Sequence, residues 1–89
     1  MPRVIFTPNI QRHIACPETE ARGKTVGEVL AKVFEQNPQA RSYILDDQSA
    51  LRRHITIFVD NRMIRDRTRL GDAVNDASTI YVFQALSGG

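Results

Sequence analysis

Apolar side chains alternate with a period of two in several parts of the chain, the spacing that puts them on one face of a β-strand. The clearest segments are residues 3–7, 54–59 and 79–84, which are rich in β-branched and aromatic residues. In segments 54–59 and 79–84, we expect the aliphatic face of each strand to point to the core. This face carries the side chains of Ile55, Ile57, Val59, Ile80 and Val82. The opposite face carries the rings of Phe58, Tyr81 and Phe83.

Between the first two of these segments, the period changes to that of a helix. Apolar residues recur at the i, i+3, i+4, i+7 and i+8 positions that line one helical face, namely Val26, Val29, Leu30, Val33 and Phe34. Thr25 followed by Glu28 has the spacing of a capping box, and Asn37-Pro38 is a stop signal. The sequence predicts one long helix over residues 25–37, with this apolar face packed in the core.

Weaker signals complete the order of elements. In chain order they are a turn at Pro8-Asn9, a second strand in residues 11–21 that forms a hairpin with the first, a short apolar segment at 43–45, a hairpin turn at Asp60-Asn61 with a return strand at 62–64, a short helical turn at 70–74, and a turn at Asn75-Asp76. Pro17 within the second strand indicates an edge position or a bulge.

This order of elements predicts an α+β domain. A single helix with one apolar stripe covers one face of one mixed sheet. The arrangement is that of the β-grasp, or ubiquitin-like, fold, with four to five strands packed on one long helix and the first and last strands paired in the middle. We expect one domain over residues 1–84, followed by a flexible tail over 85–89 that ends in Gly88-Gly89.

Composition restricts the class of protein further. The 89 residues suffice for one domain with one core. The sequence has no apolar run long enough for a membrane span and no signal peptide, and its single cysteine, Cys16, fits a reducing compartment, so we expect a cytoplasmic protein. The net charge of +2 is smaller than nucleic-acid-binding domains usually show.

Across its whole length the sequence resembles the MoaD/ThiS family of ubiquitin-like sulfur carriers. The matching segments are residues 4–6, 25–30, 45–47, 57–61 and 81–89, of which the terminal Gly-Gly is the most specific. Two turns depart from the family pattern. Asp60-Asn61 stands where an asparagine-glycine pair is usual, and residues 75–78 replace an acidic turn that contains glycine.

The resemblance implies a carrier protein and not an enzyme. An E1-like partner would use ATP to adenylate the carboxylate of Gly89, and a sulfur donor enzyme would then convert it to a thiocarboxylate. Leu86, Ser87 and Gly88 would thread the tail into the partner. Because Phe83 precedes the tail by two residues, we expect the partner to grip the face formed by Phe58, Tyr81 and Phe83, unless loops cover these rings. We expect no bound cofactor or metal, a monomer when free, and a downstream sulfur-accepting enzyme or isopeptidase. No membrane or nucleic-acid partner is implied.

Several alternatives stay open from the residues. The same terminus would also suit a ubiquitin-like modifier that is conjugated to lysines, and the sulfur could serve cysteine, molybdopterin, thiamine, thiolated tRNA or a secondary metabolite. Arginines cluster at positions 52, 53, 62, 65, 67 and 69. They could form a solvated surface or a docking patch for an acidic partner. An RNA-binding patch is a third alternative, but the cluster lacks the interleaved aromatic residues that stack on bases. Cys16 is read as a buried small side chain, and His13 and His54 have no metal-ligand spacing.

Overall fold

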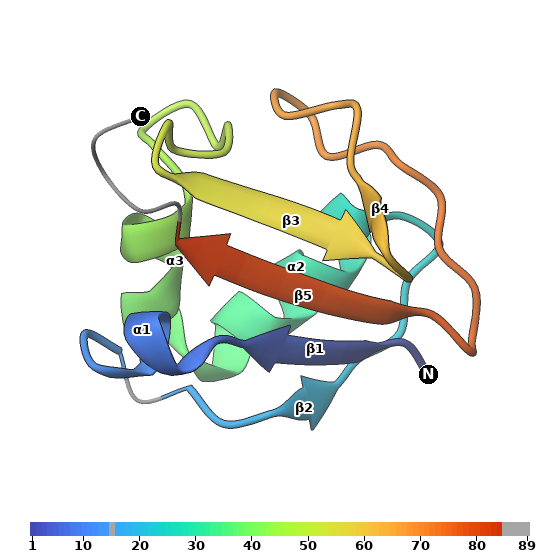
Figure 1. Cartoon of the computed structure of the whole chain (residues 1–89), viewed down its shortest axis with the longest axis horizontal. Coiled ribbons are helices and arrows are strands. Elements are labelled where there is room, and N and C mark those ends of the chain that lie inside the picture. The colour runs from blue at the N-terminus through green and yellow to red at the C-terminus, as the bar shows by residue number, and fades with distance from the viewer. Residues whose placement is uncertain (15, 85–89) are drawn as a thin grey trace.

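The computed structural model describes residues 1–14 and 16–84, which form a five-stranded mixed sheet with helices against one face (Figure 1). The elements are β1 (Arg3–Phe6), α1 (Pro8–Gln11), β2 (Thr19–Glu20), α2 (Val26–Gln36), α3 (Pro38–Ile44), β3 (Ile55–Val59), β4 (Arg62–Met63) and β5 (Thr79–Gln84). In this part of the chain, no helix has the length and apolar character needed to cross a membrane.

The strand order is β2-β1-β5-β3-β4, so the first and last long strands lie side by side in the middle of the sheet. β1 and β5 pair in parallel, with Val4 opposite Ile80 and Phe6 opposite Val82. β3 pairs with the other side of β5 in the antiparallel sense. The predicted central pairing of the β-grasp fold is confirmed, and it fixes β5 from both sides along most of its length.

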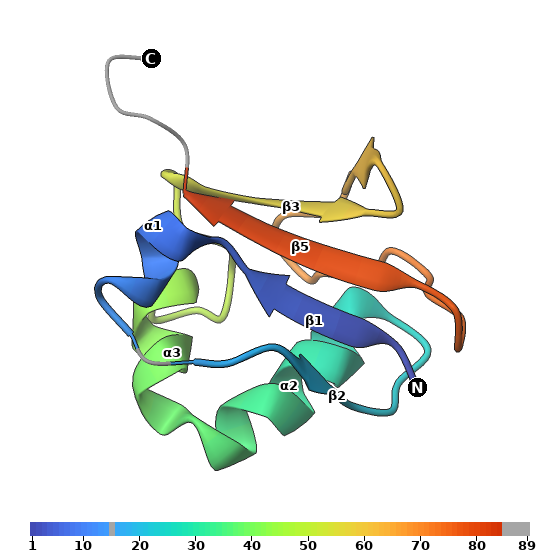
Figure 2. The same ribbon diagram turned by 60° about the horizontal axis from the view of Figure 1, so that its bottom comes forward.

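The predicted helix and its core face are also confirmed. Thr25 is the N-cap, and its hydroxyl accepts a hydrogen bond from the N–H of Glu28 at 3.1 Å. The Glu28 carboxylate in turn accepts from the N–H of Lys24 at 2.9 Å, one residue before the usual partner of a capping box. Figure 2 shows α2 beneath the sheet, and the five apolar side chains of its stripe are all buried. On the sheet, the predicted aliphatic face is buried except for the half-buried Val59.

The prediction of a long second strand over residues 11–21 is wrong. Pro8 instead opens the one-turn helix α1, and only Thr19–Glu20 pair with β1. The side chain of Gln11 explains the difference, because its amide donates to the carbonyls of Phe6 and Cys16 and accepts from the N–H of Cys16 at 3.2 Å. These bonds satisfy backbone groups that a strand partner would otherwise satisfy.

A second correction concerns α3. Asn37 ends α2 as predicted, but Pro38 immediately begins another helix, where we expected only a short apolar segment at 43–45. Proline is well tolerated in the first turn of a helix, where its missing N–H has no intrahelical partner. Ala40 and Ile44, four residues apart, are both fully buried. Burial of this face against the domain therefore stabilises a helix that is too short to persist alone.

The predicted helical turn at residues 70–74 is absent. Ala73 forms an isolated bridge with Thr25, and Leu70 has a positive φ of 56°. By contrast, the hairpin turn is confirmed, since Asp60 and Asn61 both have positive φ, at 49° and 76°. A two-residue connection of this kind fits the twist of the two strands it joins.

Candidate functional site: the uncovered sheet face and the end of β5

The face of the sheet opposite α2 carries a small aromatic cluster, formed by Phe58, Tyr81 and Phe83. The rings of Phe58 and Phe83 meet edge to face with centroids 5.4 Å apart, and those of Tyr81 and Phe83 are 6.1 Å apart. Together with Asn61, these residues line a shallow depression. Phe83 is 36% exposed, so the ring remains accessible although its neighbours contact it. We refer to this surface, made by Phe58, Tyr81 and Phe83, as the aromatic face.

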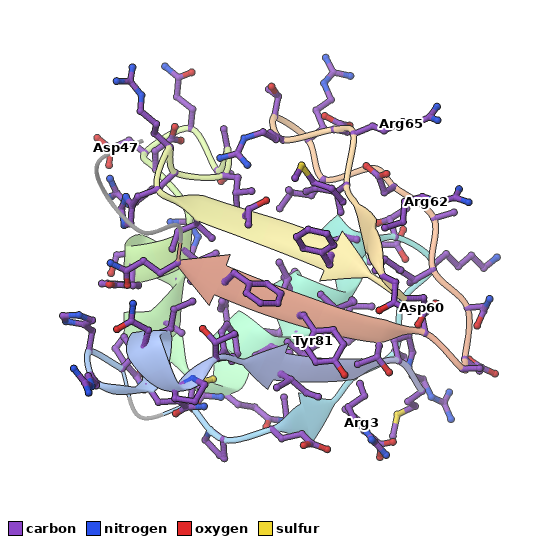
Figure 3. All side chains as sticks on the ribbon, in the orientation of Figure 1. Arg3, Asp47, Asp60, Arg62, Arg65 and Tyr81 are labelled. Atoms are coloured by element: carbon purple, nitrogen blue, oxygen red, sulfur yellow. The ribbon has the colours of Figure 1, made fainter. Side chains whose placement is uncertain are left out.

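Arginines border the aromatic face on two sides. Figure 3 shows Tyr81 projecting from the uncovered face, with Arg3 toward β2 and with Arg62 and Arg65 toward β4. The guanidinium of Arg3 pairs with the carboxylate of Glu18 at 3.2 Å, whereas among the residues described no carboxylate lies within 4.0 Å of the guanidinium of Arg62 or Arg65. An apolar centre with a charged border is the usual composition of a protein-binding surface.

The arginine cluster of residues 52–69 divides into two groups. Arg67 is structural, because its guanidinium donates to the carbonyls of Arg52 and Ile55 at 2.8 and 2.7 Å. Arg52 is likewise engaged, with its Nε donating to the carbonyl of Ser42 at 2.8 Å. The remaining members are exposed, namely Arg53, Arg62, Arg65 and Arg69. Only these four arginines are therefore exposed enough to contribute to a charged surface.

The C-terminal end of β5 is the second feature of the site. Gln84, the last residue described, accepts a hydrogen bond through Oε1 from the hydroxyl of Tyr43 at 2.6 Å. The Tyr43 ring stacks on His13 with centroids 5.2 Å apart, and His54 meets it edge to face at 5.9 Å. No pattern in the sequence predicts this cluster. Its members come from four separate segments, and the only available signal was a tyrosine in an otherwise aliphatic segment.

The remaining candidate residues are the cysteine and the possible metal ligands. Cys16 is fully buried, as expected, and burial raises the pKa of its thiol, which disfavours the reactive thiolate. Within residues 1–14 and 16–84, no group of histidine, cysteine or acidic side chains is arranged to hold a metal ion.

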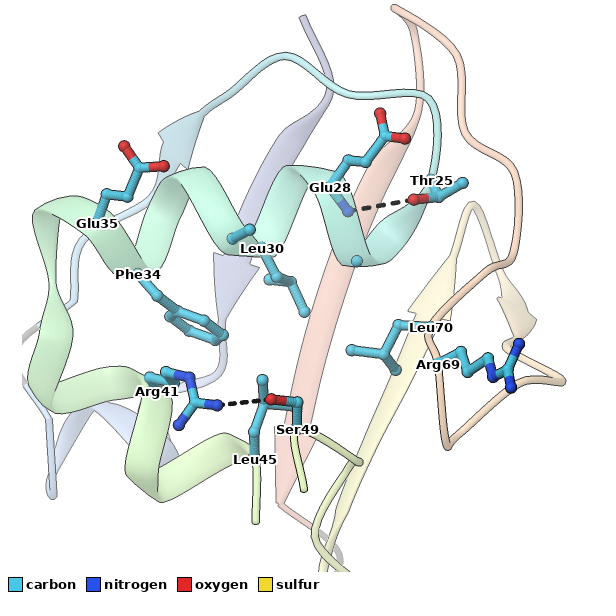
Figure 4. Close-up of a pocket in the computed structure, with 12 residues that line it drawn as sticks. Thr25, Glu28, Leu30, Phe34, Glu35, Arg41, Leu45, Ser49, Arg69 and Leu70 are labelled. Carbon is cyan, nitrogen blue, oxygen red and sulfur yellow. Dashed lines mark hydrogen bonds between the residues drawn. The ribbon is translucent and has the colours of Figure 1, made fainter. Parts of the chain in front are cut away.

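A groove of about 680 Å³ lies on the opposite side of the molecule, between α2, α3 and the loop at Leu70 (Figure 4). Leu30, Phe34, Leu45 and Leu70 form its apolar floor. These side chains are each less than 8% exposed, so the floor is the surface of the core. The groove has charged residues at its rim but no set of converging polar groups that would mark a binding site.

The predicted tail residues Leu86, Ser87, Gly88 and Gly89 lie outside the part of the chain that the structure describes. The structure does describe Gln84, which lies two residues before Leu86 in the sequence. Gln84 is the last residue of the central strand β5, which ends near α1 and α3 (Figures 1 and 2).

A parallel central pair of first and last strands, with helices on one face only, defines a ubiquitin-like β-grasp protein. A model of the ThiS family matches residues 8–89, which is nearly the whole chain. The chain therefore belongs to the ThiS family, and the resemblance to ubiquitin-like sulfur carriers is confirmed.

Solved structures share this fold over almost their whole length. A chain from the Amycolatopsis orientalis BexX/CysO complex is 25% identical, with a TM-score of 0.81 and 100% of both chains covered. Mycobacterium tuberculosis CysO is 20% identical, with a TM-score of 0.80 over 97% of this chain and 100% of that one. SAMP1 from Haloferax volcanii is 21% identical, with a TM-score of 0.77 over 99% of this chain and 98% of that one. A comparison with curated proteins gave no match.

Proposed function

We propose that this protein is a sulfur carrier whose C-terminal glycine is activated by an E1-like enzyme and converted to a thiocarboxylate. The observation that carries the proposal is the family match, which extends through Gly88 and Gly89. The fold supports it in one further respect. Residues 85–89 follow β5, a central strand that pairs with β1 as far as Val82 and with β3 as far as Gln84, so the strand that leads to Gly89 is anchored in the sheet.

The chemistry follows from the properties of a terminal carboxyl group. With a pKa of about 3.3–3.7, such a group is ionised at neutral pH, and a carboxylate resists nucleophilic attack. In the proposed first step, a carboxylate oxygen of Gly89 attacks the α-phosphorus of ATP and pyrophosphate leaves. Hydrosulfide, or an enzyme-bound equivalent, then attacks the acyl carbon and AMP leaves, so that a thiocarboxylate remains. The chain provides the reacting carboxylate, and the partner provides the catalytic side chains and uses the ATP.

Within this proposal the aromatic face is the docking surface for the activating enzyme. Its rings lie on β3 and β5, and Phe83 directly precedes the residue at which β5 ends. A partner that covers these rings would hold the strand from which the tail extends. Leu86, Ser87 and Gly88 are proposed to thread through a channel too narrow for large side chains.

A second candidate function is that of a modifier joined to lysines of other proteins through the same activated glycine. It is supported by the similarity of fold to a protein named small archaeal modifier protein 1. Isolation of the protein from its own cells distinguishes the two functions. A modifier gives isopeptide-linked adducts on target lysines, whereas a carrier gives free protein with a terminal thiocarboxylate.

The proposed function makes a prediction about the length of the tail. Wild type, a variant lacking Gly89 and a variant with one appended alanine are each incubated with the E1-like enzyme of the same organism, ATP and sulfide. Only the wild type is expected to exchange one oxygen for sulfur by intact mass. An added residue moves the carboxylate by about 3.3–3.6 Å, and a displacement of about 1 Å can already cost about a hundredfold in rate.

Unfolding curves of the three proteins are the control for stability and should coincide. Equal thiocarboxylate formation on all three would contradict the mechanism, provided that the mass spectrum shows no trimming of the appended residue.

A further inference from the structure

The last residue of β5 has a sheet neighbour on one side only. The pairing of β1 with β5 ends where Phe6 lies opposite Val82, and the N–H of Thr7 then donates to the Val82 carbonyl at 3.1 Å. On the other side, β3 continues to Gln84, which lies opposite Ile55. The final residues of β5 are therefore held by the ladder from β3 alone, and the ends of such ladders fray most readily.

Tyr43 supplies an additional contact to this end of β5, which pairs with β3 alone. Its hydroxyl donates to the side-chain oxygen of Gln84 at 2.6 Å, a bond that joins α3 to β5 across 41 residues of sequence. The bond is partly buried, which reduces competition from water. A short hydrogen bond of this kind restricts the rotamer of Gln84 and the position of its backbone.

The Tyr43 ring is itself held by contacts from two other segments. His13 stacks on it at an interplanar angle of 19°, and His54 contacts it nearly perpendicularly, at 87°. The loop that carries His13 is in turn fastened by the hydrogen bonds of Gln11 to Phe6 and Cys16. These contacts restrict the orientation of the Tyr43 ring and therefore the position of its hydroxyl group. A side chain can hold another residue precisely only when its own rotamer is fixed in this way.

We propose that Tyr43 is a positioning residue for the tail, acting through Gln84 to fix the point from which residues 85–89 extend. The inference rests on the proposed function. If the bond is absent, the end of β5 samples more orientations, and the activating enzyme must order it before the carboxylate of Gly89 reaches ATP. Tyr43 does not contact the reacting atoms in this scheme.

The expected kinetic effect separates positioning from docking. Tyr43→Phe keeps the ring and leaves the aromatic face intact, so the KM for the carrier should change little. The kcat for adenylation should fall, because placement of the carboxylate matters most in the transition state. A net hydrogen-bond contribution of about 0.5–1.5 kcal/mol corresponds to a decrease of about two- to tenfold.

The test is ATP–pyrophosphate exchange with the E1-like enzyme of the same organism, measured for wild type, Tyr43→Phe, Gln84→Met and the double variant. Both single variants should lower kcat by a similar factor, and the double variant should be no worse than either. Gln84→Glu retains an acceptor oxygen, so exchange with this variant should stay close to the wild-type rate. Ser49→Ala is the matched control, since it removes another 2.6 Å bond of α3, made by Arg41, away from β5.

Unchanged kcat in both single variants, or additive losses in the double variant, would overturn the role of Tyr43. A loss in Ser49→Ala as large as that in Tyr43→Phe would also overturn it, because it would show a general effect on α3. Absence of exchange with the wild-type protein would instead contradict the proposed function on which the inference rests. Melting curves identify any variant that fails to fold, and if Tyr43→Phe is such a variant, Gln84→Met tests the same bond from its acceptor side.

Discussion

At the scale of single residues, aspartate side chains hold the loop between β4 and β5 in place of regular secondary structure. The Asp66 carboxylate accepts hydrogen bonds from the backbone N–H groups of Arg69, Gly71 and Thr68, at 2.9, 3.1 and 3.2 Å. Asp72 accepts from the N–H groups of Arg65 and Asp66. A carboxylate can satisfy several donors at once, so one side chain organises a whole turn.

The bonds to Asp66 predict a specific dependence of stability on pH. The hydrogen bond from the N–H of Arg69 is the largest influence on the Asp66 carboxyl and lowers its pKa. Burial opposes this effect, but the N–H groups of Gly71 and Thr68 and the charge of Arg69 lower the pKa further, so the net shift is downward. A lowered folded-state pKa stabilises the fold at pH values above the unfolded pKa of about 3.9 and ceases to do so as the pH falls through the folded value. Asp66→Asn should therefore be less stable than wild type at about pH 7, with a smaller difference at about pH 3.

Urea unfolding of wild type and Asp66→Asn at the two pH values measures this difference, and all other titrating groups are common to both proteins. A gap of constant size at both pH values would show that the charge of Asp66 does not contribute to the stability of the loop.

At the scale of elements, α2 is the one helix whose formation local sequence explains. It has a cap at Thr25, an acidic residue in its first turn at Glu28, and a continuous apolar face. The shorter α1 and α3 have no side-chain cap bond, and each begins at a proline. Their stability depends on the burial of Ile10 and Ile44 in the same core.

Truncation of the α2 face should accordingly destabilise the whole domain. Leu30 is 1% exposed, and Leu30→Ala is expected to cost about 2–5 kcal/mol, a large part of the roughly 5–15 kcal/mol that stabilises a small domain. Chemical unfolding measures the loss. Lys32→Ala on the exposed side of the same helix is the control and should change stability by no more than about 0.5 kcal/mol. Similar values for the two variants would be incompatible with the observed packing.

At the scale of the whole molecule, the sheet divides the domain into two unlike sides. Helices and a continuous core cover one face, and the other keeps the rings of Phe58, Tyr81 and Phe83 near solvent. The end of β5 lies at the margin of this second face, and there the tail follows. The proposed docking surface and the proposed reacting group are therefore connected through a single strand, β5.

This arrangement predicts separate roles for the aromatic face and the core. The double variant Phe58→Ala with Phe83→Ala should remain folded, because both rings lie on the face away from the core. Its KM in adenylation should increase by at least about tenfold, since removal of buried aromatic anchors from an interface commonly costs more than about 1 kcal/mol each. Unchanged kinetics in a folded variant would exclude this face as the docking surface.

The sequence by itself determined the elements that depend on local interactions. The α2 stripe, the Thr25 cap, the alternation of β3 and β5, and the Asp60-Asn61 turn each involve neighbours within a few residues, and their order was enough to indicate the β-grasp fold. The family resemblance was readable for the same reason, because it rests on segments whose patterns are local.

Only the tertiary structure decided the features that join distant segments. Gln11 turns an expected strand into a loop, Arg67 satisfies carbonyls more than ten residues away, and Tyr43 reaches Gln84 across the domain. The short helix α3 likewise forms because its apolar side meets a core built from other elements. Such contacts carry no periodic signal, since the partner of a polar side chain is fixed by the folded geometry and not by spacing along the chain.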